Sequence, residues 1–387
     1  MEFLSQGPLF LGSLVFMLGV VVVVHELGHY LAGRFYGAAA ESFSVGFGKP
    51  IFEVTDKRNT RWRVNWIPLG GFVKFVGESQ LAGDVGKIES GPVGRAFPEL
   101  GVGPRSVIAV AGPAANFILA AVIFSLMLFF NGSVREEIGI SGVNEGSPAA
   151  VAGFQAGDVI QTIKGEPVES RSDFLPIIQL GADEEILVDV LRDTETVRLA
   201  VTPERVTREN AIGQITSMGN IGVGLTVTRL EPDRFGVLDS IVGGIVETGE
   251  TLDTTVWMIG RMATGKEPLS SLTGPVGIGD TTRRVYNGAI EATHVPLSQR
   301  LNYLFWTTLQ ICALVSVGIG FFNLLPLPVL DGGHLVFNAY EALMGKALPA
   351  KVQEASLTAG LVLLIGMFVF VTWGDILETG IFKSAGG

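Results

Sequence analysis

The chain has 387 residues, of which 48% are hydrophobic and only 17% are charged, and its mean hydropathy is +0.44. A soluble domain carries about 25% charged residues, so this composition excludes a disordered or purely soluble protein and favours a membrane protein. The net charge of −11 excludes nucleic acid as an obvious partner, and the single cysteine, Cys312, excludes an internal disulfide and a cysteine-based metal cluster.

Four stretches are long and apolar enough to cross a bilayer, which takes about 20 helical residues. The first lacks the basic start of a secretory signal and continues directly into His25, Glu26 and His29, so we expect it to be retained. The sequence therefore predicts a multi-pass α-helical membrane protein with four transmembrane helices. The stretches run from Pro8 to about Tyr36, Ser106 to Phe130, Tyr303 to Leu325 and Leu357 to Trp373.

Charge divides unevenly between the regions that connect these spans. The loop from Arg34 to Arg105 has ten basic and seven acidic residues, whereas the region from Asn131 to Arg300 has 14 basic and 24 acidic residues. Because basic loops stay on the cytoplasmic side, we expect the first loop to be cytoplasmic. The acidic region and both termini are then expected outside.

The acidic region begins with a module that we predict to be rich in β structure. Between Ser141 and about Glu204, short apolar runs alternate with turn residues, which is typical of a small β-rich domain. After Asp233, apolar residues recur at helical spacing from Val237 to Met262, with acidic residues between them. This pattern predicts an amphipathic helix on the membrane surface or against the spans, or alternatively packed on the small domain.

Three ionisable residues interrupt the first apolar span. His25 and His29 are four residues apart, so both imidazoles lie on one face of a helix and can bind one Zn²⁺. Glu26 follows the first histidine and can act as a general base toward a water molecule. Because charge inside a bilayer costs at least about 2.5 to 3.5 kcal/mol, this placement favours a function over simple packing.

The candidate for a third ligand follows the third span. Pro326 and Pro328 cannot continue a helix, so the chain unwinds there, and unwound backbone at membrane depth needs protein or a wet cavity around it. We predict Asp331 as the third ligand and Asn323 as an amide that holds a substrate strand or polarises a carbonyl. The alternatives are an N-cap role for Asp331, helix packing for Asn323, and ligation or support of the metal by His334.

These residues resemble a known family, the site-2 protease (M50-type) intramembrane zinc metalloproteases, and in particular its bacterial branch of the regulator of sigma-E protease type. An ectodomain inserted between the second and third spans is a shared feature. The motifs that carry the resemblance are His25-Glu26-Leu27-Gly28-His29, Asn323-x-x-Pro326-x-Pro328-x-Leu330-Asp331-Gly332, Gly112-Pro113-Ala114-Ala115-Asn116, Pro68-Leu69-Gly70-Gly71-Phe72-Val73-Lys74 and Gly274-Pro275-Val276-Gly277-Ile278.

The resemblance implies roles for individual residues. His25, His29 and Asp331 would be the zinc ligands, Glu26 the catalytic base, and Asn323 a residue that contacts the substrate or the transition state. Two apolar segments, Phe43 to Phe52 and Trp62 to Phe75, would form the family's membrane-dipping β-hairpin. Its edge would add a substrate strand and so unwind a transmembrane helix before cleavage, although a hairpin that only rests at the interface is the alternative.

The β-rich module resembles a PDZ domain through Gly146-Ser147-Pro148-Ala149-Ala150 and the Gly157-Asp158 pair that follows. One copy is recognisable, because the segment Thr207 to Arg234 is too short for a second, whereas the best-known Gram-negative relatives carry two. Ile138-Gly139-Ile140 is a candidate loop for a free carboxyl terminus, or alternatively a plain edge strand.

The resemblance implies regulated intramembrane proteolysis in the cytoplasmic (inner) membrane of a bacterium. Because His25 lies 17 residues, or roughly 25 Å of helix, beyond Pro8, we expect the active site near the cytoplasmic face. The substrates would be single-span membrane proteins, such as anti-sigma factors first cut by a site-1-type protease, or remnant signal peptides. The alternatives are a metal-ion transporter and a catalytically inert PDZ scaffold in the membrane. The expected division of the chain is 1–36, 37–105, 106–130, 131–205, 206–300, 301–335 and 336–387.

Overall fold

The computed structural model describes residues 2–77, 91–133, 136–209, 215–230, 233–265, 275–291 and 294–379. These residues belong to two compact units. The larger unit joins the chain up to Leu126 with the segment from Asp239 to Ile376. The smaller unit consists mainly of the segment from Met127 to Leu238, which contains the β-rich domain.

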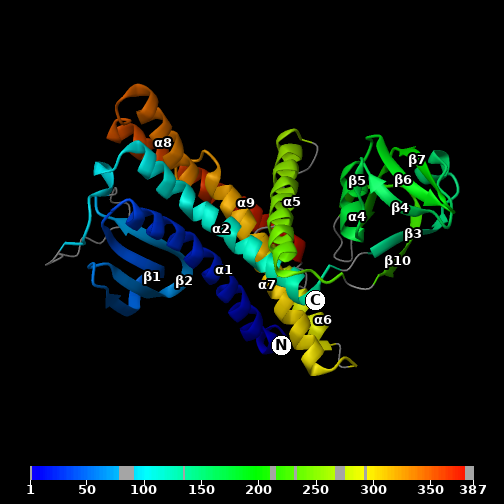
Figure 1. Cartoon of the computed structure of the whole chain (residues 1–387), viewed down its shortest axis with the longest axis horizontal. Coiled ribbons are helices and arrows are strands. Elements are labelled where there is room, and N and C mark those ends of the chain that lie inside the picture. The colour runs from blue at the N-terminus through cyan, green and yellow to red at the C-terminus, as the bar shows by residue number, and fades with distance from the viewer. Residues whose placement is uncertain are drawn as a thin grey trace. The chain divides into compact units, whose positions relative to one another are not determined.

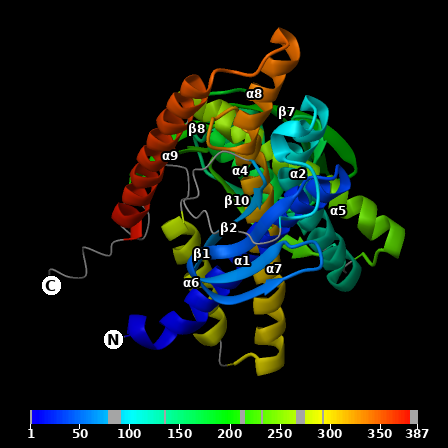
Figure 2. The same cartoon turned by 90° about the vertical axis from the view of Figure 1, so that its left-hand side faces the viewer.

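Four described helices are long and apolar enough to span a membrane, which confirms the four predicted spans. Each is longer than predicted, because polar residues at the ends continue the helix beyond its apolar part. Helix α9 is the least covered, with only 6% of its most apolar window buried, and Figure 2 shows it standing apart from α7. The four helices are α1 (Glu2–Phe35), α2 (Val102–Asn131), α7 (Leu297–Leu324) and α9 (Ala350–Thr379).

Helix α1 lies between α2 and a long β-hairpin, and it also contacts α7 (Figure 1). The hairpin consists of β1 (Ala40–Thr55) and β2 (Arg61–Phe75), which pair in antiparallel fashion as predicted. Its base packs on the end of α1 and the start of α2 through a buried apolar cluster. The members of this cluster are Tyr30, Ala38, Ala40, Phe43, Phe75, Leu100 and Ile108.

Strand β2 folds around β1, so that the first half of β1 pairs with the beginning of β2 on one side and with the end of β2 on the other. Ser44, for example, is opposite both Phe72 and Arg63. The segment Gly71–Phe75, which we call the edge segment, is therefore an outer strand of this small sheet. At the hairpin turn, the Asp56 carboxylate accepts hydrogen bonds from the backbone amides of Arg58 and Thr60 at 2.8 and 3.0 Å. The far part of the hairpin exposes apolar side chains, including Trp66, which is 70% exposed.

The segment that contains the two prolines unwinds as the sequence predicts. Helix α7 ends at Leu324, the backbone is extended at Leu325, and α8 (Asp331–Met344) begins after the break. The other helices of the larger unit are η1 (Phe97–Glu99), α5 (Val237–Ala263) and α6 (Pro275–Glu291). Helix α5 is the amphipathic helix expected after Asp233. In the motif Gly274–Ile278, Gly274 lies outside the described residues and Pro275 begins α6.

The smaller unit is built on an antiparallel sheet with the strand order β10-β3-β4-β6-β7, in which β5 also pairs with β4. Its core is a cluster of buried aliphatic side chains around Phe174. In the same unit, the buried carboxylate of Asp158 forms an ion pair with the Arg192 guanidinium at 2.8 Å. The elements are β3 (Glu136–Val143), α3 (Pro148–Ala152), β4 (Val159–Ile163), β5 (Glu166–Pro167), α4 (Arg171–Leu180), β6 (Ile186–Arg192), β7 (Glu195–Val201), β8 (Glu204–Glu209), β9 (Ile215–Asn220) and β10 (Val223–Arg229).

Two features of this unit differ from the sequence-based expectation. Strand β10 pairs with β3, so the sheet continues past residue 205, where the expected division ends the domain. Ile138-Gly139-Ile140 is neither a loop nor an edge, because β3 is paired with β10 on one side and with β4 on the other. Ile138 and Ile140 are buried in the core instead. Local pattern could not reveal a strand pairing between residues that are 80 to 93 positions apart in the sequence.

Candidate metal centre and active site

The two histidines of α1 meet at the centre of a buried site. Their four-residue spacing stacks both rings on one helical face, with the Nε2 atoms 3.2 Å apart. His25 is only 7% exposed. Both rings therefore turn one nitrogen toward the same point inside the protein.

Asp331 completes this group from the other end of the chain. Its Oδ2 lies 3.2 Å from Nε2 of His25, and its Oδ1 lies 3.3 Å from Nε2 of His29. The break after α7 produces this placement, because Asp331 is the first residue of α8 and projects from the start of that helix. Leu330 occupies the N-cap position, so Asp331 is not the N-cap of α8.

The geometry of these three residues fits a zinc ion. Zinc bonds of about 2.0–2.1 Å in a tetrahedron require neighbouring ligand atoms to be about 3.3 Å apart. The two Nε2 atoms are 3.2 Å apart, and each lies 3.2 or 3.3 Å from a different oxygen of the Asp331 carboxylate. With one ligand atom taken from each residue, the three atoms all lie within 4.8 Å of one another, close enough to share one ion. Two imidazoles and one carboxylate also form a ligand set of known catalytic zinc sites, in which a fourth position stays open.

His334 does not belong to this group. Among the described residues, the only cluster of three potential metal ligands is His25, His29 and Asp331. His334 lies one turn further along α8, lines the adjoining cavity and packs edge-on toward Phe337. The structure thus offers no support for His334 as a metal ligand.

Helix α2 forms the wall behind the two histidines. The carbonyl oxygen of Ile108 lies 2.7 Å from Nδ1 of His29, and the side chain of Asn116 lies 3.3 Å from Nδ1 of His25. Between them, a Cβ atom at Gly112 would collide with the ring atoms of His29. In the same way, a Cβ at Gly28 would collide with the backbone of Ala111. The two glycines allow α1 and α2 to approach closely enough for α2 to hold both rings.

Glu26 and Asn323 lie next to the three candidate ligands. The Glu26 carboxylate accepts a 2.9 Å hydrogen bond from the backbone amide of Val73 in the edge segment of the hairpin. Asn323 lies in the last turn of α7, and its Nδ2 is 3.5 Å from Nε2 of His25. The structure therefore brings all five predicted site residues together.

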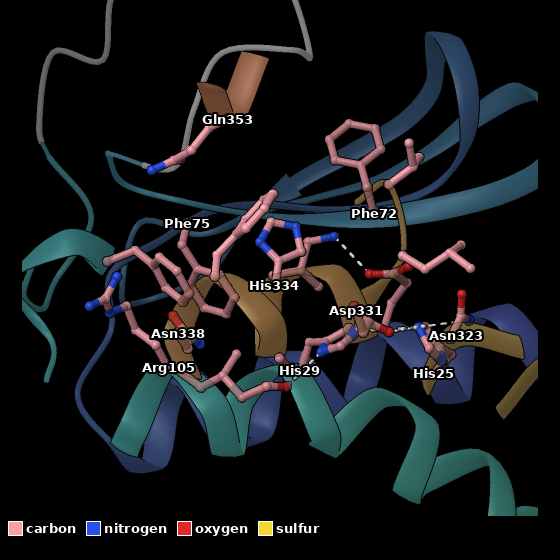
Figure 3. Close-up of a pocket in the computed structure, with 18 of the residues that line it drawn as sticks. His25, His29, Phe72, Phe75, Arg105, Asn323, Asp331, His334, Asn338 and Gln353 are labelled. Atoms are coloured by element: carbon pink, nitrogen blue, oxygen red, sulfur yellow. Dashed lines mark hydrogen bonds and ion pairs between the residues drawn. The ribbon is translucent and has the colours of Figure 1, made fainter. Parts of the chain in front are cut away.

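These residues open into a cavity of about 590 Å³. Figure 3 shows His25, His29, Asp331 and Asn323 grouped at one end of it and Arg105 and Gln353 at the other. The edge segment contributes Phe72 to its lining. At the distant end, Arg105 of α2 forms a 2.6 Å ion pair with Glu341 of α8. This cavity thus connects the candidate metal centre with the region where α2 begins and α8 ends.

Comparison with known proteins places this arrangement in a family. The sequence pattern of peptidase family M50 matches residues 13–367. The chain is 39% identical to the metalloprotease MmpA of Caulobacter vibrioides over 97% of both chains. It is 28% identical to the zinc metalloprotease RasP of Oceanobacillus iheyensis, over 94% of this chain and 98% of that one.

The chain belongs to peptidase family M50. The predicted family is thereby confirmed, and this M50 chain is a zinc metalloprotease and a multi-pass membrane protein. Among solved structures, the chain is similar to the PDZ domain of the SdrC-like protein of Listeria monocytogenes. That match has 19% identity and a TM-score of 0.19, and it covers 23% of this chain and 85% of that one.

Sequence reasoning about this M50 protease missed the contacts that support the metal ligands. The motif Gly112–Asn116 was recognised, but without a role for any of its residues. The position of Asn116 in an apolar span could have indicated its role, because polar groups inside a membrane need hydrogen-bond partners. The contributions of the Ile108 carbonyl and the Val73 amide come from the backbone, so no residue type could indicate them.

Proposed function

We propose that this M50 protease hydrolyses peptide bonds within the transmembrane segments of single-span membrane proteins. The observation that carries the proposal is the position of the His25, His29 and Asp331 cluster beside Glu26. His25 lies within the apolar part of α1, ten residues or roughly 15 Å of helix from Phe35 and further from Pro8, where the predicted span begins. A protease with a site at that depth meets peptide bonds that soluble proteases cannot reach.

His25, His29 and Asp331 would hold the zinc ion. When bound, zinc supplies Lewis-acid chemistry, which polarises a carbonyl group and makes a water molecule acidic at neutral pH. Glu26 would accept the proton of the attacking water as general base and return it to the leaving amine nitrogen as the peptide bond breaks. Asn323 would donate a hydrogen bond from Nδ2 to the carbonyl oxygen on which negative charge develops.

The β-hairpin would prepare the substrate for this reaction. A helical peptide bond is shielded by its own hydrogen bonds, so a transmembrane substrate has to unwind before cleavage. The edge segment borders the cavity, and an extended substrate could add to it as a further strand. The exposed apolar side chains of the hairpin favour its insertion among lipids.

The orientation and the substrates follow from charge and from family resemblance. We place the basic first loop in the cytoplasm and the acidic region, with the β-rich domain and both termini, outside the cytoplasmic membrane of a bacterium. The active site then lies nearer the cytoplasmic face. Anti-sigma-factor-like proteins after a first cut by a site-1-type protease, and remnant signal peptides, are the proposed substrates.

The test uses the full-length protein reconstituted in lipid with a panel of transmembrane peptides and a matched soluble peptide. Glu26→Gln should keep its zinc but cleave at least about 10²-fold more slowly, because the base is lost. Asp331→Asn should lose zinc as well as activity, and Glu354→Gln, a change at an exposed glutamate in α9, should behave as wild type.

Two results would contradict the proposal. A zinc-loaded Glu26→Gln variant with normal cleavage would remove Glu26 from the mechanism. Faster cleavage of the soluble peptide than of every transmembrane peptide would show that the enzyme does not work on membrane-embedded segments.

A further inference from the structure

One face of α2 contacts both histidines through residues four apart. Ile108, Gly112 and Asn116 occupy successive turns of this face. Ile108 contacts His29 through its backbone carbonyl, Gly112 provides the space for the rings, and Asn116 contacts His25 through its side chain. The two histidines thus have different partners at their outer nitrogens, a carbonyl in one case and an amide in the other.

The carbonyl partner determines the form of His29. A neutral imidazole carries one N–H, and a metal binds the nitrogen that lacks it. Because the Ile108 carbonyl can only accept, Nδ1 of His29 has to donate to it at 2.7 Å. Nε2 of His29 is then the nitrogen with the free lone pair, and it points toward Asp331.

The amide partner of His25 leaves two possibilities. Asn116 is completely buried, its Nδ2 lies 3.3 Å from Nδ1 of His25, and its Oδ1 has no hydrogen-bond partner. An amide presents its oxygen and nitrogen in nearly the same shape, so a half turn of the group exchanges the two. That turn would bring Oδ1 to Nδ1 of His25, where it can accept a hydrogen bond, and move Nδ2 to the position that Oδ1 has now.

We propose that Asn116 is a positioning residue whose Oδ1 accepts a hydrogen bond from Nδ1–H of His25 and thereby directs the lone pair of Nε2 to the zinc ion. The inference rests on the proposed ligand role of His25. With the opposite amide orientation, Nδ2 would donate to Nδ1, the proton of His25 would be on Nε2, and that nitrogen could not bind a metal. Asn116 thus does for His25 what the Ile108 carbonyl does for His29.

The test compares two substitutions of similar size in the full-length protein. Asn116→Asp keeps an acceptor toward His25, whereas Asn116→Leu fills the space without one. Zinc affinity, measured by competition with a chelator, should fall about 10- to 100-fold in Asn116→Leu. Asn116→Asp should bind zinc as tightly as wild type or more tightly, because a carboxylate is the stronger acceptor. If Asn116→Leu does not fold, weaker zinc binding by Asn116→Asp than by wild type still overturns the inference.

The control variant is Ser316→Ala. The hydroxyl of Ser316 donates a 2.9 Å hydrogen bond to the backbone carbonyl of Asn116, so this change weakens the contact between α7 and α2 without touching the amide side chain. Its zinc affinity should equal that of wild type. A loss in Ser316→Ala as large as that in Asn116→Leu would mean that helix packing alone explains the effect, and the inference would be wrong.

The remaining outcomes separate this inference from the proposed function. Weaker zinc binding in Asn116→Asp than in Asn116→Leu would show that the amide donates or only packs, which overturns the inference. The inference is also overturned if Asn116→Leu binds zinc as tightly as wild type while His25→Ala no longer binds zinc. If His25→Ala itself retains zinc with wild-type affinity, the proposed ligand set fails, and the role of Asn116 fails with it.

Discussion

The backbone amide of Val73 donates its hydrogen to the carboxylate of Glu26 over 2.9 Å. This contact joins the edge segment of the hairpin to the candidate base on α1. The donor is a main-chain group, so it fixes the carboxylate without adding a charge to the site. The hairpin therefore orients the proposed general base as well as bordering the cavity.

Replacement of Val73 by proline tests this contact, because proline has no N–H to donate. We expect Val73→Pro to bind zinc normally but to cleave about tenfold more slowly, since a general base has to be held within hydrogen-bond reach of its proton. An outer strand tolerates proline where its N–H points away from the sheet. Val73→Ala retains the amide and should cleave as wild type. Equal rates for the proline and alanine variants would show that the amide has no role.

The close approach of α2 to the histidines leads to a second prediction. Gly112→Ala places a methyl group against the rings of His29 and His25, so the rings have to move and the zinc site should be lost. Gly318→Ala in α7 is the matched control, because a Cβ there meets nothing within 4 Å. Zinc content after purification distinguishes the two variants. Full zinc occupancy in Gly112→Ala would mean that α2 does not hold the rings.

The buried ion pair of the β-rich domain gives a prediction about pH. Burial raises the pKa of Asp158, but hydrogen bonds from the Arg192 guanidinium and the Gln155 amide outweigh this effect, so the pKa lies below its usual value. A carboxyl whose pKa is lower in the folded state stabilises the fold above its unfolded pKa of about 3.9. This stabilisation is fully present near neutral pH and is lost as the pH falls through the folded pKa.

Hydrogen exchange of β4 and β6 in the full-length protein measures this effect. Arg192→Met leaves a buried carboxylate without its main partner and should destabilise the domain by about 1–3 kcal/mol near neutral pH. The difference from wild type should shrink in acid. Arg205→Met, which removes an exposed pair with Asp183, should have little effect at any pH. A difference between Arg192→Met and wild type that stays constant into acid would exclude Asp158 as its source.

The membrane spans and the grouping of the candidate site residues could be predicted because each has a strong local signal, whereas the hairpin was expected from the family resemblance. The histidines show helical spacing inside an apolar run, and Pro326 and Pro328 mark the break that precedes Asp331. The pairing of β10 with β3 could not be predicted in the same way, because strand pairing depends on contacts between distant segments. The support of the histidines by α2 depends on how two helices cross, which a single sequence does not specify.

The break between α7 and α8 also has a consequence for biosynthesis. Asp331 is the proposed third ligand, and a ribosome adds it only after it has made the first three spans of the 387-residue chain. A nascent chain with α1 and α2 already in the membrane therefore carries two histidines without a hydrolytic centre. On the proposed ligand set, the complete metal site can therefore form only after the last part of the chain has been made.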